Sequence, residues 1–264
     1  MHEGALLLYN VATMPTPAIE IRQLVHRYAR AEEPAVNGLD MTVTAGETVG
    51  LLGPNGAGKT TTLHAILGLL QPTAGTVSVF GCSPLRHRMD VLSRMNFASV
   101  DVDLPSNLTV AECLQVFARI YGMRPVRPRV EALMERFGLS EFRRQLIGTL
   151  SAGEQMRLKL CKALVNDPEL LILDEPTLSL DPYRAQRVRE LLKTIQRERQ
   201  LAILHTSHNM QEVETFCDRI IFLHRGRKLT EGPPREVLER FKSRSLDELF
   251  IRVAESGELF DANP

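Results

Sequence analysis

The stretch Gly53-Pro-Asn-Gly-Ala-Gly-Lys-Thr60 decides how this chain folds. It matches the pattern G-x-x-x-x-G-K-[ST] of a loop that wraps around phosphate groups. The five residues before it, Thr48-Val-Gly-Leu-Leu52, predict a short buried strand. After it, apolar residues recur from Leu63 to Leu70 at the spacing of one helix face. The loop is therefore expected between a strand and a helix, which is the setting that this motif requires.

The glycines of this loop allow the backbone to turn tightly, so that its N–H groups and the start of the next helix converge on an anion. We expect Lys59 to reach the β- and γ-phosphate oxygens of ATP and Thr60 to hold Mg²⁺. A glycine-rich turn before an ordinary helix has the same pattern, so the loop alone leaves this alternative open. The residues expected to line the phosphates are Gly53, Pro54, Asn55, Gly56, Ala57, Gly58, Lys59, Thr60 and Thr61.

The composition is that of an ordinary globular protein, with 264 residues, 44% hydrophobic and 24% charged. Lys plus Arg and Asp plus Glu total 32 each, and this balance argues against a dedicated nucleic-acid binder. The four cysteines are far apart and are expected to be reduced thiols, of which Cys113, Cys161 and Cys217 fall in apolar helical patterns and are expected to be buried. No apolar run approaches the roughly 20 residues that a membrane span needs.

Alternating apolar and polar residues at 19–28 and 39–43 predict antiparallel strands joined by a turn. Tyr28 ends the first of these strands, where its ring would stack on an adenine base or else pack at the sheet edge. The apolar strands expected later in the chain lack alternation, as in a parallel sheet covered on both faces. These strands are 169–173, 201–204 and 219–223.

Helical patterns dominate the middle of the chain and predict a lobe inserted in an α/β frame over about residues 83–165. The individual helices of this lobe are expected at 84–95, 109–121, 126–137 and 152–165. An apolar face formed by Leu246, Leu249, Phe250 and Val253 predicts a helix that closes the frame. The expected organisation is a loose leader at 1–17, one domain at 18–243, and a closing helix with a tail at 244–264.

A second chemical motif follows one of the apolar strands, where Asp174 and Glu175 end the run Leu170-Leu-Ile-Leu. Ligands bind at the carboxyl ends of parallel strands, beside a phosphate loop. Asp174 would hold Mg²⁺ through water, and Glu175 would polarise the water that attacks the γ-phosphate. A strand that ends in charged turn residues is the alternative, and the phosphate loop upstream makes it much weaker.

A third motif, Leu150-Ser-Ala-Gly-Glu154-Gln155, begins a helix. Ser151 followed three residues later by Glu154 is the pattern of a capping box, which by itself predicts only a well-capped helix. A helix start is also an anion site, so the structural and the functional interpretations are compatible.

Together the three motifs resemble the nucleotide-binding subunit of ABC transporters, and the resemblance covers about residues 18–255. It implies an α/β cassette with a P-loop NTPase core: a mostly parallel sheet, an N-terminal antiparallel subdomain and an inserted helical subdomain. It further implies that Tyr28 stacks on adenine and that His208, rather than the nearby His205, contacts the γ-phosphate. Asp181, in Ser179-Leu-Asp181, corresponds to a loop that couples two ATP sites, although the usual Gly is Ser179 here.

In this family the phosphate loop of one subunit faces the signature helix of another, so the resemblance implies a dimer that sandwiches ATP. Ser151 and Gly153 of the partner would donate to the γ-phosphate. It also implies Mg²⁺ as a cofactor, a separate membrane permease as a partner and a location on the cytoplasmic face of the membrane. The phosphate-loop context and the closing segment from Ser245 to Phe250 are most similar to subunits of export systems.

Two departures from the family pattern stand out. The family has a Gln after the strand near residue 100 that contacts Mg²⁺, and the segment from Asn96 to Asp103 contains no Gln here. Ser99, Asp101 and Asp103 are the candidates to replace it, and none of them is a close match. The signature contains Ala152 and Glu154 where the family has Gly and Gln. Because Glu154 brings negative charge near a phosphate, we expect reduced rather than absent ATPase activity.

Two other functions share the phosphate loop. A soluble ABC-type ATPase that remodels a nucleic-acid or protein assembly usually carries two cassettes or a long coiled-coil insertion, and this sequence has neither. A metabolite kinase would leave the signature motif and His208 unexplained.

Overall fold

A computed structural model of the chain describes residues 16–99, 102–178 and 180–256. Most of the expected leader, Asp101 and Ser179 lie outside the described residues. So do residues 257–264 of the expected C-terminal tail.

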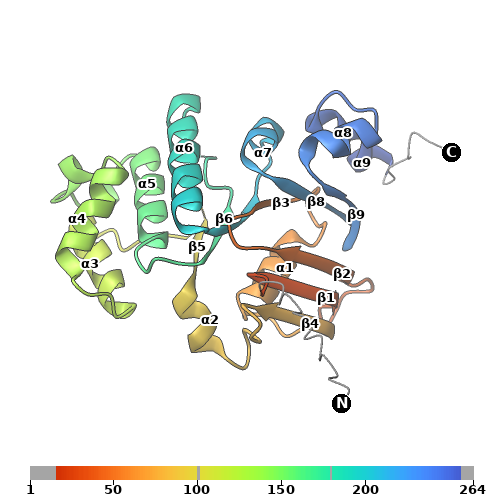
Figure 1. Ribbon diagram of the computed structural model, residues 1–264, viewed down its shortest axis with the longest axis horizontal. Helices are drawn as coiled ribbons and strands as arrows, with labels where there is room; N and C mark the ends of the chain where they lie inside the picture. Colours follow the sequence, from red (N-terminus) through yellow and green to blue (C-terminus); the bar gives the residue numbers. More distant parts are fainter. Residues whose placement is uncertain (1–15, 100–101, 179, 257–264) are drawn as a thin grey trace, which may run out of the picture.

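The fold is built on a six-stranded sheet with the strand order β5-β6-β7-β3-β8-β9 (Figure 1). All neighbouring strands are parallel except β9, which pairs antiparallel with β8 at one edge. The strand bounds are Thr48–Leu52 for β3, Met95–Ser99 for β5, Leu170–Asp174 for β6, Ala202–Thr206 for β7, Arg219–His224 for β8 and Arg227–Gly232 for β9. The last residues of three adjacent strands, Ser99, Asp174 and Thr206, pair in register, so their side chains end in one row.

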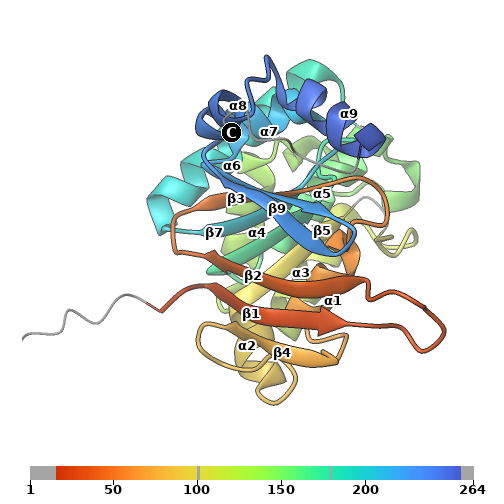
Figure 2. The same cartoon turned by 90° about the vertical axis from the view of Figure 1, so that its right-hand side faces the viewer.

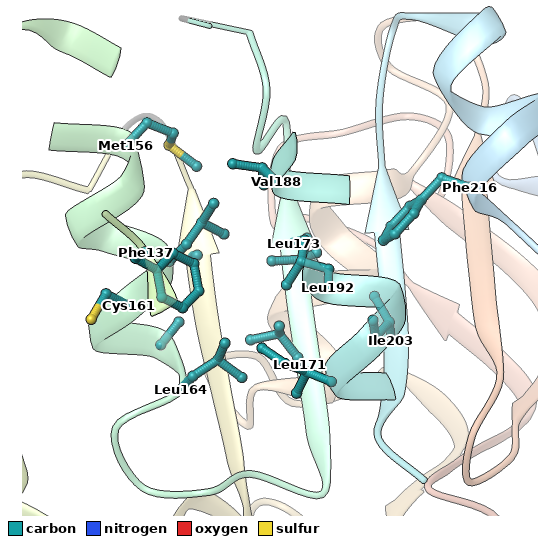
Figure 3. Packing of buried hydrophobic residues seen from close by; sticks show 14 of the residues in the cluster. Phe137, Met156, Cys161, Leu164, Leu171, Leu173, Val188, Leu192, Ile203 and Phe216 are labelled. Atoms are coloured by element: carbon teal, nitrogen blue, oxygen red, sulfur yellow. The ribbon is translucent and has the colours of Figure 1, made fainter. Parts of the chain in front are cut away.

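Both faces of this sheet are buried, which explains its continuous apolar strands. In β6, Leu170 and Ile172 point into the core shared with the N-terminal sheet, whereas Leu171 and Leu173 point to the opposite face. On that opposite face they pack with Val188, Leu192 and Ile203, and Figure 3 shows these side chains between the helical lobe and the sheet. The predicted parallel sheet is therefore confirmed.

A second sheet of three antiparallel strands has the order β2-β1-β4 and lies below the central sheet in Figure 2. Its strands are β1 Ile19–His26, β2 Val36–Val43 and β4 Ala74–Val79. Helix α1, Lys59–Ile66, contributes its buried face to the apolar cluster that joins the two sheets. The predicted antiparallel strands are confirmed, although β1 ends two residues before Tyr28.

The helical lobe consists of α3 Val110–Ile120, α4 Val126–Arg136 and α5 Ala152–Ala163, seen at the left of Figure 1. Short 3₁₀ turns at Ser140–Phe142 and Ile147–Thr149 connect α4 to α5. Helix α6, Pro182–Arg199, packs Val188 and Leu192 against the adjoining face of the central sheet. Helices α7 Met210–Phe216, α8 Pro234–Arg240 and α9 Leu246–Ser256 follow along the chain.

Two helices are shorter than their apolar patterns predict. The helix expected at 84–95 begins only at Arg88 and ends at Arg94, and Met95 starts β5, a strand of the central sheet inside the range expected for the lobe. Helix α1 ends at Ile66, because Gly68 adopts a left-handed backbone (φ 64°) that turns the chain away. Leu70 therefore packs on the core from outside the helix.

The closing helix is confirmed as α9. Leu246, Leu249 and Val253 are fully buried, and the Phe250 ring packs 6.0 Å from that of Phe222 in β8. The three cysteines expected in apolar patterns are buried, and all four are free thiols.

Replacing Leu171 by Ala tests the core beneath the sheet. The residue has no solvent exposure, so we expect the variant to lose about 2–5 kcal/mol of unfolding free energy through lost apolar contacts and a cavity. Leu69, which is 61% exposed in the turn after α1, is the matched control. Urea unfolding with an unchanged slope measures the difference, and equal effects of Leu171→Ala and Leu69→Ala would contradict this account of the core.

His208 is exposed, whereas His205, three residues earlier, is part of the core. The ring of His205 in β7 is fully buried, packs edge-on at 5.3 Å against Phe216, and has no hydrogen-bond partner on either nitrogen. Burial, assisted by the charge of Arg189, lowers the pKa of His205 from 6.5 to about 3. The folded protein therefore holds this ring in its neutral form.

This burial predicts a loss of stability in acid. As the pH falls below about 6.5, the unfolded chain takes up a proton on His205 and the folded chain does not. The free energy of unfolding therefore decreases until the pH reaches the pKa of His205 in the folded protein, about 3. We expect His205→Leu to weaken this decrease between pH 6.5 and 4, measured as the thermal unfolding midpoint. His87→Leu, on the surface, should behave as the wild type, and an unchanged profile for His205→Leu would disprove the assignment.

Candidate nucleotide-binding site

The phosphate loop connects β3 to α1, as its sequence predicts. All three of its glycines have backbones with positive φ, 144° at Gly53, 79° at Gly56 and 105° at Gly58. A Cβ atom at Gly53 would lie 2.2 Å from the Leu223 carbonyl oxygen, and one at Gly58 would lie 2.6 Å from that of Ala35. Only glycine fits at these two positions, so the loop is held close to its neighbours and curls around the start of α1.

Lys59 is the first residue of α1, and its side chain turns back over the loop. Its ammonium group donates to the carbonyl oxygens of Gly53 at 2.6 Å and Pro54 at 3.1 Å. Burial lowers the pKa of Lys59, while the charges of Glu175 and Asp174 act in the opposite direction. The lysine and the two carboxylates therefore share one electrostatic environment, although more than 110 residues separate them in the sequence.

Tyr28 lies beside this loop. Its hydroxyl is 3.2 Å from that of Thr61 in α1, and its ring makes an edge contact of 4.7 Å with His26. The ring is not packed into the sheet, because the residue is 46% exposed. Thr60, which directly precedes Thr61, is exposed, so its hydroxyl is accessible at the start of the helix.

Asp174 ends β6 and is held by hydroxyl groups from both neighbouring strands. Thr206 at the end of β7 donates to one carboxylate oxygen, and Ser99 at the end of β5 lies 3.5 Å from the other. Of the three residues considered as replacements for the expected Gln, Ser99 thus contacts the acidic site. Asp103 is exposed in the loop after β5, and Asp101 lies outside the described residues.

Glu175 follows Asp174 and has an unusual backbone, with a positive φ of 52°. The conformation turns its carboxylate toward His208: the backbone N–H of His208 donates to Oε2 at 3.2 Å, and its ring nitrogen Nε2 lies 3.4 Å from Oε1. Burial raises the pKa of Glu175, against the opposing effect of His208. A carboxylate with a raised pKa beside a phosphate loop has the character of a general base.

The structure also distinguishes His205, within β7, from His208, which follows the strand. The His208 side chain is 48% exposed and contacts Glu175, whereas His205 is fully buried. The structure thus places His208, and not His205, beside Glu175, and the expected contact of His208 with the γ-phosphate stays a prediction.

The signature residues form a helix start elsewhere on the molecule. Ser151 caps α5 in a complete capping box: its hydroxyl accepts from the Glu154 N–H, and its own N–H donates to the Glu154 carboxylate at 2.8 Å. Asp181 caps α6 in a similar way by accepting from the Arg184 N–H at 3.0 Å. Among the residues that the structure describes, no hydrogen bond or ion pair joins Ser151, Gly153 or Asp181 to the phosphate loop.

The sequence analysis overlooked two polar residues behind the site, Thr177 and Glu212. Both are buried, and the Thr177 hydroxyl donates to the Glu212 carboxylate. The sequence offers a weak signal for them, since one lies two residues after Glu175 and the other four residues after His208. Neither position has a spacing that indicates contact.

Within the described ranges, each helix is too short or too polar to cross a membrane. In the same ranges, His, Cys, Asp and Glu side chains do not gather in groups of three or more that could hold a metal ion. Any metal at Asp174 would need ligands of another kind, such as hydroxyl and phosphate oxygens.

Comparison with known proteins agrees with this geometry. The ABC transporter family matches residues 36–178, which is more than half of the chain. The Nod factor export ATP-binding protein I of Burkholderia lata is 41% identical over 228 residues, covering 86% of this chain and 74% of that protein.

Solved structures give the same result. The structure of an ATP binding subunit of an ABC transporter has a TM-score of 0.82 and 28% identity, covering 90% of this chain and 99% of that one. A dimeric bacterial ABC transporter cassette has a TM-score of 0.73 and 25% identity, covering 81% and 98%. The chain therefore belongs to the ABC transporter family, of which it is an ATP-binding and ATP-hydrolysing subunit.

Proposed function

We propose that this subunit supplies the energy for export through a membrane permease. The observation that carries the proposal is the convergence of Lys59, Asp174, Glu175 and His208 at the carboxyl edge of the parallel sheet. Similarity to a Nod factor export ATP-binding protein supports the direction of transport. The transported substrate would be selected by the permease.

In the proposed reaction, the loop N–H groups and Lys59 bind the β- and γ-phosphates. The Glu175 carboxylate accepts a proton from a water molecule aligned with the γ-phosphate, and that water attacks phosphorus as the bond to ADP breaks. His208 holds the Glu175 carboxylate in place and would contact the γ-phosphate. Tyr28 would position the nucleotide by stacking on its adenine ring.

The residues present are compatible with Mg²⁺ at this site. The exposed hydroxyl of Thr60 and the carboxylate of Asp174, oriented by Thr206 and Ser99, would hold the ion. Mg²⁺ binds through few protein ligands and keeps waters and phosphate oxygens, which suits a site with one carboxylate. When bound, it would neutralise charge on the terminal phosphates.

The proposed working unit is a dimer in which each ATP lies between two chains. Ser151 and Gly153 lie at the start of α5, and Asp181 caps the start of α6. Among the described residues, none of the three forms a hydrogen bond or ion pair with the phosphate loop of its own chain. A second chain would bring its Ser151 and Gly153 to the γ-phosphate, and the dimeric cassette among the similar structures supports this arrangement. Only the closed state then makes both sets of contacts, so ATP drives closure and hydrolysis releases it.

The proposed partner is an integral membrane permease, with this subunit attached to it on the cytoplasmic face. The described residues contain no helix suited to crossing the bilayer, so contact with the membrane would come through that partner.

Glu175→Gln tests both the base and the dimer. We expect the variant to bind ATP normally but to hydrolyse it at least about a hundredfold more slowly, because the amide cannot accept the proton. Trapped ATP would hold the closed state, so the variant should elute as a dimer in Mg²⁺ and ATP. Lys59→Ala is the control, because it should lose ATP affinity and stay monomeric. A Glu175→Gln variant that turns over normally and remains monomeric would contradict the assignment.

Purification from membranes tests the export role. We expect the tagged chain, extracted from its native host in mild detergent, to copurify with a protein that has several membrane spans. Addition of that partner should change the ATPase rate of the purified subunit. Recovery only with ribosomes or in the cytosol would favour the assembly-remodelling alternative instead.

A further inference from the structure

Glu212 is a buried carboxylate that the proposed reaction does not use. It lies in the first turn of α7, and its side chain is only 1% exposed. One carboxylate oxygen accepts a hydrogen bond from the Thr177 hydroxyl. The other has no hydrogen-bond partner and lies 3.8 Å from the His205 ring and 3.9 Å from the Arg189 guanidinium. A carboxylate is costly to bury, so its retention here calls for an explanation.

Thr177 connects this carboxylate to the proposed catalytic base. It follows Glu175 by two residues, with Pro176 between them. Glu175 has a left-handed backbone, which residues other than glycine adopt uncommonly and at a cost in free energy. On one side the Glu175 N–H is fixed to the Thr206 carbonyl oxygen at 3.1 Å. On the other side the first side-chain anchor is the bond from Thr177 to Glu212.

The same glutamate is tied to the segment that carries His208. The backbone N–H of Glu212 donates to the side chain of Asn209 at 3.1 Å, and Asn209 directly follows His208. One buried residue therefore bonds to both segments whose tips meet in the contact of 3.4 Å between Glu175 and His208. Moving Glu212 would change the relative position of those two side chains.

We propose that Glu212, acting through Thr177, is a positioning residue that holds the Glu175 backbone in its left-handed conformation and aligns its carboxylate with His208. The inference rests on the proposed role of Glu175 as the base. Glu212 itself touches no reacting atom, and its effect is expected on the chemical step rather than on ATP binding. Among the residues that the structure describes, no hydrogen bond or ion pair joins the phosphate loop to Glu212 or Thr177, so ATP binding should be unaffected.

Thr177→Val is the main test, because it keeps the shape of the side chain and removes only the hydroxyl. We expect kcat to fall about tenfold to a hundredfold, as for a small misplacement of a reacting group, while the ATP dissociation constant changes less than about threefold. Thr177→Ser retains the donor and should stay close to the wild-type rate. Thr194→Val is the matched control, since the Thr194 hydroxyl donates to the backbone carbonyl of Glu190 in its own helix α6.

Glu212→Ala provides the other half of a double-mutant cycle. Alone, Glu212→Ala should lower kcat as Thr177→Val does. The double variant should be no slower than the slower of the two single variants, because both substitutions remove the same hydrogen bond. A wild-type kcat for folded Thr177→Val would overturn the inference. The inference would also fail if kcat and ATP affinity fell equally and in proportion to the loss of thermal stability. Such a result would mean that the bond between Thr177 and Glu212 is purely structural.

Glu175→Gln, measured in parallel, separates the two proposals. If it hydrolyses ATP normally, the assignment of the base fails and the positioning role fails with it. If Glu175→Gln is inactive while Thr177→Val is fully active, only the positioning inference fails and the proposed function stands.

Discussion

The parallel pairing of β5, β6 and β7 is the constraint on which the rest of the molecule depends. Because these strands pair in register, Ser99, Asp174 and Thr206 end in one row, and their side chains bond to one another. Parallel strands require long connections, and here those connections are the helical lobe and α6. The acidic end of the sheet and the bulk of the helices are therefore two consequences of the same topology.

Charge balance explains how two adjacent carboxylates persist at a partly buried edge. Asp174 and Glu175 lie near the ammonium group of Lys59, which is itself desolvated and is stabilised by their charges. The burial that raises the pKa of Glu175 is opposed by His208. A triphosphate adds negative charge to this place, and the cationic and N–H groups of the phosphate loop are the part of the site that can balance it.

The parts of the site that could be predicted from sequence are those specified locally. The phosphate loop needs glycines at fixed spacing, and the capping box of Ser151 and Glu154 spans four residues, so both could be recognised in a short window. The helix expected at 84–95 is too long at both ends: it begins only at Arg88, and at its other end strand pairing of Met95 with β6 outweighs the local apolar pattern. The bond from Thr177 to Glu212 joins residues 35 apart, and no periodicity in the sequence indicates it.

The signature glutamate shows how a departure from a family pattern can be accommodated. The carboxylate of Glu154 is turned back to the start of its own helix, where it accepts the Ser151 N–H, and this bond lowers its pKa. The positive charges of Arg157 and Arg184 act in the same direction. The negative charge is thus partly compensated by the helix start and by two arginines before any phosphate approaches. A Gln at this position would make the same capping bond without the charge, so the difference between the two residues is electrostatic and not one of helix geometry.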